Sequence, residues 1–371
     1  IEMSMELPYS NNLQIGKLSS VFNYVTNTYK YYWFLSILDY LQEREHEIPV
    51  HNIVIRMIAK VWYPVNYFHL SFGKLDRLAA AVETIRSELN CDVDIEEDQL
   101  FSLVQNQMNH QGIRKILKDL ARFVPFRYLT PWFASEVRGI KDADKNKTLK
   151  ELAGKYYYSE YNAPPYRFNR DESAIIIQPQ WKEYFITHMK ILKDFTFWHL
   201  LNFLSKQNPN VPNIQTKFFP PQKRDFRYAK KFWNLYFDDR KQINCIYSGL
   251  PVTSENFNID HFVPWSFVTH DQLWNLLPIP QQVNSAKSDN LPARKYLEDF
   301  GDLQYDAFCR VLQKFSTTPQ LLEDYSILFN DSIRNIQQLP KDKFVETLEE
   351  TIQPLLQIAG NMGFETEWEY A

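Results

Sequence analysis

Apolar positions recur every three to four residues along most of the chain, a period that predicts helices. The predicted helices cover residues 13–45, 49–64, 74–90, 95–122, 181–207, 296–315, 319–329 and 341–359. In the third of these, the face expected to be buried carries Leu75, Leu78, Val82 and Ile85. Short β-favouring runs occur at residues 174–181 and in a stretch that ends at residue 261. The pattern therefore predicts a mainly helical protein.

Residues 208–221 interrupt the helical period. This segment, NPNVPNIQTKFFPP, holds four prolines, and proline breaks a helix because it lacks a backbone N–H. We therefore predict a domain boundary here. The expected organisation is a helical domain of residues 1–215, a central domain of residues 216–295, and an acidic helical segment of residues 296–371 packed on the core.

The composition is that of an ordinary soluble globular protein, with 44% hydrophobic residues, 23% charged residues and a net charge of −4. Cys91, Cys245 and Cys309 lie far apart and form no CxxC pair, which argues against a disulfide framework and a structural zinc site. No run of about 20 apolar residues occurs, and the first residues have no signal-peptide pattern. We therefore expect a cytoplasmic protein without membrane contact.

Charge is distributed unevenly along the chain. The segment after the predicted boundary is basic, which predicts a nucleic-acid-binding surface formed by Lys223, Arg224, Arg227, Lys230, Lys231 and Lys241. A second basic segment, residues 138–172, interleaves lysines with tyrosines. This mixture suits a surface that follows phosphates and stacks on bases, and it is also typical of a solvated linker. Acidic residues dominate beyond residue 296.

Chemically active side chains gather in residues 244–292. A β-favouring run ends in Asp260 and His261, because Pro264 prevents its continuation, and a helical segment carrying Asn275, Asn284 and Lys287 follows. Successive strand residues face opposite sides, so the carboxylate and the imidazole suit different roles. One Asp and one Asn leave most of an octahedral shell free, as Mg²⁺ or Mn²⁺ requires, and a neutral histidine suits proton removal from water. A rival histidine, His270, is expected to be exposed in the linking loop.

The same stretch resembles the HNH (His-Asn-His, ββα-metal) endonuclease family. Its sequence motifs are most similar to those of the HNH domains of type II CRISPR effector nucleases and their transposon relatives. These domains begin with CxYxG, contain IDHxxPxSF and end with NxxKSDNxP. The matching segments are residues 245–249 (CIYSG), 259–267 (IDHFVPWSF) and 284–292 (NSAKSDNLP). Some members carry two CxxC pairs for zinc, so this chain, with Cys245 alone, resembles the zinc-free branch.

The resemblance implies a role for each residue of the stretch. Asp260 and Asn284 would bind one Mg²⁺ or Mn²⁺ ion, and no zinc is expected. His261 would be the general base, Asn275 would brace the loop that orients it, and Lys287 would contact a phosphate. The implied fold is mainly α with a small α+β (ββα-metal) nuclease core, a helical N-terminal domain and a helical C-terminal tail.

The predicted function is metal-dependent endonuclease cleavage of DNA, in restriction or anti-phage defence. One such site cuts one strand, so a double-strand break requires a homodimer or a partner protein of a defence system. Two alternatives stay open. In the first, the chain is a nuclease subunit that is inactive until a partner or signal releases it. In the second, it is an inactive nucleic-acid-binding scaffold.

Overall fold

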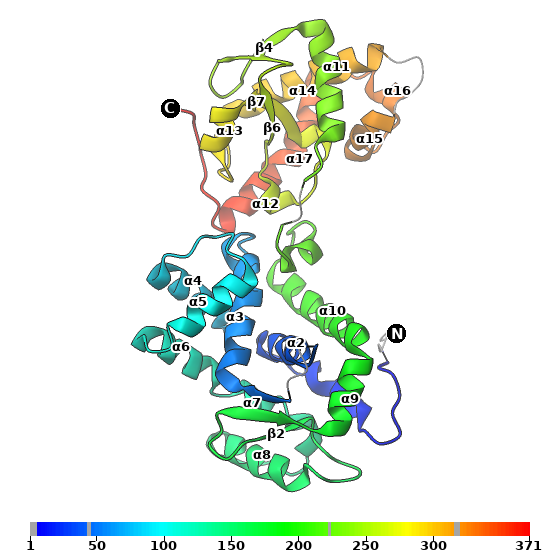
Figure 1. The fold of residues 1–371 in the computed structure, drawn as a ribbon. Helices are drawn as coiled ribbons and strands as arrows, with labels where there is room; N and C mark the ends of the chain where they lie inside the picture. Colours follow the sequence, from blue (N-terminus) through cyan, green and yellow to red (C-terminus); the bar gives the residue numbers. More distant parts are fainter. Residues whose placement is uncertain (1–5, 43–45, 222–223, 315–319) are drawn as a thin grey trace. The chain divides into compact units, whose positions relative to one another are not determined.

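The structure, a computed structural model, describes residues 6–42, 46–221, 224–314 and 320–371 and divides the chain into two compact units (Figure 1). Unit 1 comprises Ile1–Pro209 and Phe218–Pro220, and unit 2 comprises Asn210–Lys217 and Pro221–Ala371. The described residues are mainly helical with three small sheets, which confirms the predicted fold class. None of the described helices is long and apolar enough to cross a membrane.

Unit 1 is built around α2 (Tyr29–Gln42), which is buried on almost every face. This helix packs against α3 (Val50–Asn66), α9 (Pro179–Thr187) and α10 (Met189–Gln207). Aromatic rings fill the contacts: the Phe34 ring meets that of Phe185 edge-on at 5.3 Å, an arrangement that adds about 0.5–1.5 kcal/mol to the area buried. The aromatic run of residues 31–34 is therefore core.

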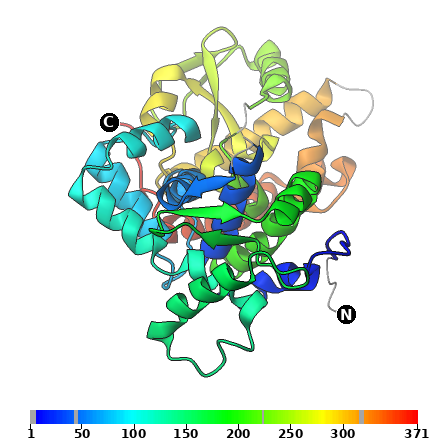
Figure 2. The same cartoon turned by 60° about the horizontal axis from the view of Figure 1, so that its bottom comes forward.

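Further helices surround this centre. They are α1 (Ile15–Ser19), α4 (Leu78–Leu89), α5 (Glu97–Asn106), α6 (Gln111–Ala121), α7 (Val124–Arg127) and α8 (Asp142–Tyr156), with the 3-10 turns η1 (Ser20–Phe22) and η2 (Thr130–Phe133). Helices α4, α5 and α6, drawn in cyan, group on one side of α3 (Figures 1 and 2). An antiparallel sheet has the order β1 (Glu47–Pro49), β3 (Ala174–Ile177), β2 (Tyr166–Phe168), with Ile175 opposite Ile48 and Phe168.

Three of the predicted helices are interrupted in the structure. Residues 13–45 break before α2, because the Asp76 carboxylate accepts hydrogen bonds of 2.6 Å from both the backbone N–H and the hydroxyl of Thr28. Residues 95–122 form α5 and α6, and residues 181–207 form part of α9 and then α10. Pro64 was predicted to end a helix and instead lies inside α3.

Two further predictions in unit 1 need correction. Leu75 precedes the first turn of α4 and is 72% exposed, so its predicted burial was wrong. The run 174–181 is a strand only as far as Ile177, because Pro179 opens α9 and Gln178 caps it by accepting a hydrogen bond from Trp181 N. The basic segment 138–172 folds into α8 and β2, which excludes the solvated-linker interpretation.

Unit 2 contains a ββα arrangement. Strand β6 (Phe257–His261) pairs antiparallel with β7 (Leu276–Pro280), and α13 (Gln281–Lys287) packs against both strands. The connection between the strands holds α12 (Trp265–Val268) and the 3-10 turn η4 (Leu273–Asn275). The predicted helical segment is therefore a strand followed by a short helix, since Pro278 and Pro280 cannot donate the backbone hydrogen bonds of a helix interior.

The remaining elements of unit 2 cover this arrangement. The strands β4 (Gln242–Asn244) and β5 (Pro251–Thr253) form a hairpin whose turn includes Gly249 at a φ of +68°, a conformation that favours glycine. The helices are α11 (Arg227–Arg240), α14 (Tyr296–Gln313), α15 (Glu323–Phe329), α16 (Ile333–Ile336) and α17 (Lys341–Asn361), and the 3-10 turns are η3 (Ile214–Phe218) and η5 (Gln320–Leu322). Helix α14 packs against α11 and α17.

Gln304, fully buried on α14, joins three elements of unit 2. Its Nε2 donates to the carbonyl of Leu276 at 2.7 Å, and its Oε1 accepts a hydrogen bond of 2.6 Å from the Tyr325 hydroxyl. Leu276 is the first residue of β7 and lies opposite His261. This buried amide therefore supports the strand that pairs with the candidate site.

Replacing Gln304 with methionine should destabilise unit 2. The substitution keeps the side-chain volume but leaves the Leu276 carbonyl and the Tyr325 hydroxyl buried without partners, at a cost of about 1–3 kcal/mol in unfolding free energy. Urea unfolding followed by circular dichroism measures this change. The matched control is Gln338→Met, which alters an exposed glutamine and should leave the midpoint in place. Equal midpoints for both variants would contradict the expectation.

Candidate functional site

Asp260 and Lys287 form a buried ion pair between β6 and α13. The Lys287 Nζ lies 3.3 Å from Asp260 Oδ1 and 3.2 Å from Oδ2, and it donates a 2.7 Å hydrogen bond to the carbonyl of His261. The lysine is fully buried and the aspartate is 4% exposed. One ammonium therefore holds the last two residues of the strand.

The hydrogen bonding of Asp260 is incomplete. Its Oδ2 is buried and accepts no hydrogen bond from the residues that the structure describes, although the Lys287 ammonium is close enough for electrostatic attraction. Burial raises the pKa of Asp260, and Lys287 and His261 oppose that effect. Burial and then the Asp260 charge raise the pKa of Tyr247 well above its usual value. The carboxylate thus lacks full compensation within the protein.

Asn284 lies on α13, one turn before Lys287, and is half-buried. Its side-chain amide forms no hydrogen bond within the described part of the chain. Because α13 packs against β6, Asn284 and Asp260 belong to elements in direct contact. An amide oxygen and a carboxylate oxygen are both hard ligands of the kind that Mg²⁺ binds. These two residues could therefore hold such an ion.

His261 is held by a residue that the sequence analysis did not identify. Its Nε2 lies 2.8 Å from Asp271 Oδ1. An ionised carboxylate can only accept, so Nε2 carries the proton and Nδ1 keeps its lone pair. The imidazole is 3% exposed and lies 5.7 Å from the Phe226 ring. Burial lowers the pKa of His261, and the hydrogen bond to Asp271 opposes this shift.

His270, the rival histidine, is not the exposed residue that was predicted. It is half-buried, with its ring 5.3 Å from that of Trp274. Burial lowers its pKa to about 4, so the imidazole is neutral near neutral pH. Its neighbour Asp271 lies ten positions after His261, and no motif in the sequence pointed to it.

Asn275 forms hydrogen bonds to the backbone of the two residues that follow β6. Its Oδ1 accepts a 2.8 Å hydrogen bond from Val263 N, its Nδ2 donates to Val263 O at 2.9 Å, and its backbone carbonyl accepts from Phe262 N at 2.8 Å. The side chain is fully buried. These contacts lie directly after His261, and they fix the direction of the chain there.

Residues 213–217 hold the far side of the same loop. The fully buried Lys217 donates to the carbonyls of Ser266 (3.2 Å) and Phe267 (2.5 Å), and Asn213 donates to that of Val268 at 3.0 Å. Burial lowers the pKa of Lys217 to about 7. Carbonyls at the end of a short helix attract a positive charge, so this lysine stabilises the loop that leads to Asp271.

The predicted nucleic-acid-binding cations have different environments. Lys230, Lys231 and Lys241 are exposed, whereas Lys223 lies outside the described residues. Arg227 is bound to the Asp225 carboxylate, with hydrogen bonds of 2.8 Å from Nε and 2.6 Å from Nη2. Arg224 differs: its guanidinium lies 5.6 Å from the Phe226 ring and 5.7 Å from the Trp265 ring, and its charge contributes to the lowered pKa of His261. Arg224 is therefore the predicted cation that acts electrostatically on the imidazole.

Lys287 lies in a different environment from the one that we predicted. We predicted that it contacts a phosphate, but a fully buried ammonium paired with Asp260 presents no charge to a ligand at the surface. In the structure the ammonium is instead paired with the Asp260 carboxylate. Sequence alone could not separate these roles, because both require a lysine at the same position of the motif.

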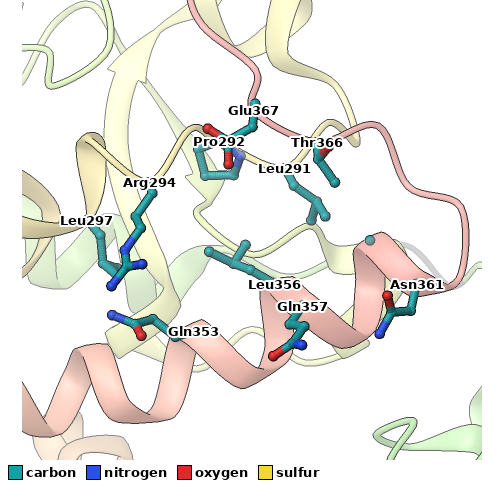
Figure 3. A pocket seen from close by; sticks show the side chains of 11 residues that line it. Leu291, Pro292, Arg294, Leu297, Gln353, Leu356, Gln357, Asn361, Thr366 and Glu367 are labelled. Carbon is teal, nitrogen blue, oxygen red and sulfur yellow. The ribbon is translucent and has the colours of Figure 1, made fainter.

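A cavity elsewhere in unit 2 is separate from the predicted site. Its volume is about 510 Å³, and it lies between α17 and residues 291–297, with Arg294, Gln353, Gln357, Asn361 and Glu367 around leucine side chains (Figure 3). None of the predicted site residues lines this cavity. In the described ranges, no three His, Cys, Asp or Glu side chains are grouped so as to hold a metal ion, and the three cysteines are free thiols.

Comparison with known protein families identifies a similarity in unit 2. Residues 245–293 match a family model described as HNH endonuclease, and the match covers β5, β6, β7 and α13 with Asp260, His261, Asp271, Asn275, Asn284 and Lys287. Searches of curated proteins and of solved structures found no match. The ββα part of unit 2 is therefore similar to HNH endonucleases, and the likeness covers this small part of the chain.

Proposed function

We propose that the chain is a metal-dependent DNA endonuclease, with its active site on β6, α13 and the loop between β6 and β7. The observation that carries the proposal is the pair formed by His261 and Asp271, next to a buried Asp260 oxygen without a hydrogen bond. The HNH endonuclease match to residues 245–293 supports the same reaction.

The residues present fit a divalent cation. Asp260 Oδ2 is a buried, unsatisfied oxygen, and Asn284 supplies an unengaged amide from the adjacent helix. We propose that these two residues hold Mg²⁺ or Mn²⁺, with water and a phosphate oxygen completing the shell, and that zinc is not used. Such an ion would polarise the phosphoryl group and stabilise the leaving oxygen.

His261 is proposed as the general base. Because Asp271 accepts the proton of Nε2, the lone pair of Nδ1 is free to take a proton from a water molecule. The water oxygen then forms a bond to phosphorus while the bond to the 3′ oxygen breaks. The products are a 5′-phosphate and a 3′-hydroxyl. Asn275, through its two hydrogen bonds to Val263, holds the backbone that positions the imidazole.

We propose that Arg224 takes the phosphate contact that was predicted for Lys287. Its guanidinium is exposed, lies over two aromatic rings and is near enough to influence the His261 charge. A planar guanidinium suits phosphate oxygens because it can donate two parallel hydrogen bonds. Lys230, Lys231 and Lys241 would then extend the contact along the DNA.

The biological setting is proposed to be restriction or anti-phage defence in the cytoplasm. One site cuts one strand, so cleavage of a duplex requires a homodimer or a partner protein that supplies a second site. Two alternatives are a subunit that needs a partner for activity and an inactive nucleic-acid-binding scaffold. Incubating the pure protein with plasmid DNA and Mg²⁺ or Mn²⁺ separates them. Activity only with a partner supports the first, and no activity under any condition supports the second.

Wild-type protein should nick supercoiled plasmid in Mg²⁺ or Mn²⁺ and not in EDTA. His261→Ala should lower the cleavage rate by at least about 100-fold, because proton transfer from water is lost, while its affinity for DNA stays near that of the wild type. Gel assays of plasmid conversion and fluorescence anisotropy measure the two quantities. Cleavage by His261→Ala at the wild-type rate would refute the role of the imidazole.

Asp271→Asn should slow cleavage by about 10- to 100-fold, because an amide can donate to Nε2 and so favour the tautomer that protonates Nδ1. DNA affinity should not change, which separates positioning of the base from substrate binding. Asp271→Glu keeps a carboxylate and should recover part of the rate. Asp289→Asn, an exposed neighbour in the motif, is the matched control. If Asp271→Asn and Asp289→Asn cleave equally well, the positioning role is excluded.

Arg224→Gln should lower the single-turnover cleavage rate by about 10- to 100-fold, the effect of losing a charge-assisted hydrogen bond to the phosphate. Arg227→Gln removes the same charge from a guanidinium already bound to Asp225, so it should change the rate little. Rates measured at saturating protein compare the two variants. Equal losses of rate in the two variants would mean that the loss of one positive charge explains the effect, and not the loss of a contact at the scissile phosphate.

A further inference from the structure

Helix α6 (Gln111–Ala121) of unit 1 has one strongly basic face. At 100° per residue, Arg114, Lys115, Lys118 and Arg122, the residue that follows the helix, project within an arc of about 100°. All four are exposed. The opposite face carries the buried Ile113, Leu117 and Leu120 and packs toward α3 and α4. The apolar face is thus used for packing, and the basic face is left for solvent or a ligand.

These four cations form no ion pair within the described part of the chain. Some other cations of unit 1 are engaged: Lys60 pairs with Asp39 at 2.5 Å, and Arg127 pairs with Asp142 at 2.9 Å. The acids near α6 do not neutralise its basic face. Glu88 pairs with His110 at 3.4 Å, Glu172 pairs with Lys150, and Asp119 lies at the edge of the basic arc.

The charge of this face is opposite to that of the whole protein. The chain has a net charge of −4, yet α6 and its C-cap carry four cations and one carboxylate, Asp119. Unpaired positive charges held close together repel one another, and a polyanion relieves that repulsion while releasing its own counter-ions. The exposed Phe123 ring lies beside these cations, 5.0 Å from the Arg122 guanidinium.

We infer that the basic face of α6 binds the phosphate backbone of duplex DNA. Arg114, Lys118 and Arg122 follow one another at four-residue steps, about 6 Å apart along the helix axis, which suits contacts to separate phosphates of one duplex. The choice of DNA rests on the proposed nuclease function. The contact would give unit 1 a substrate-binding role that is independent of the catalytic residues in unit 2.

The test measures DNA affinity of the full chain in EDTA, so that no cleavage occurs. The probe is a fluorescein-labelled DNA duplex of mixed sequence, titrated at several salt concentrations. The triple variant Arg114→Gln, Lys118→Gln, Arg122→Gln should bind more weakly. The slope of log affinity against log salt should flatten by about 0.9 for each phosphate that the variant no longer neutralises, or about 2.7 for three.

The control removes three charges elsewhere in unit 1, with Lys74→Gln, Lys190→Gln and Lys206→Gln. This variant should keep the wild-type slope. Equal slopes for the triple variant and the wild type, equal losses for both variants, or no DNA binding by the wild type would each overturn the inference. Because no cleavage occurs in EDTA, this assay tests DNA binding by α6 alone. The proposed nuclease activity is tested separately by the dependence of plasmid nicking on His261.

A second measurement needs no substitution. Duplex DNA should protect Lys115 and Lys118 of the wild-type chain from acylation by an amine-reactive reagent, as read by mass spectrometry of tryptic peptides. Lys190, exposed on α10, should react equally with and without DNA. Equal reactivity of all three lysines in saturating DNA would exclude a contact at α6.

Discussion

The buried ion pair between Asp260 and Lys287 is the interaction on which the candidate site depends. Because the same ammonium also donates to the His261 carbonyl, it ties α13 to the two residues of β6 that carry the proposed chemistry. Removing one partner of a buried pair typically costs about 3–5 kcal/mol, since the other charge is left uncompensated. The pair therefore fixes the position of the carboxylate and the imidazole before any ligand arrives.

The pair does not satisfy the carboxylate completely. One oxygen of Asp260 stays buried without a hydrogen bond, and burial raises the pKa of the group. Polar atoms of this kind are rare in folded proteins because they cost free energy, and a bound cation would recover that cost. The Lys287 ammonium already compensates part of the Asp260 charge, and it would repel such a cation. The site therefore combines a fixed counter-ion, Lys287, with a carboxylate oxygen that has no hydrogen bond and could bind a metal ion.

The loop after β6 is held from two sides. Asn275, at the end of η4, forms hydrogen bonds to Val263, while Lys217 and Asn213 donate to the carbonyls of residues 266–268. Asp271 lies at the end of this supported loop and accepts from His261. An imidazole held through such supports keeps one orientation and one tautomer, which is what the proposed proton transfer from a water molecule requires.

Sequence alone determined the helical character, through the three-to-four period, and the motif residues of the ββα part, through their types and spacing. It did not determine where the helices break, because Asp76 interrupts the first one from 48 residues away. Nor did it separate a phosphate-binding Lys287 from a buried counter-ion, or single out Asp271 among the acids. Periodicity reports which face of an element is buried. Which side chains meet inside depends on contacts between distant residues, and only the tertiary structure decided those.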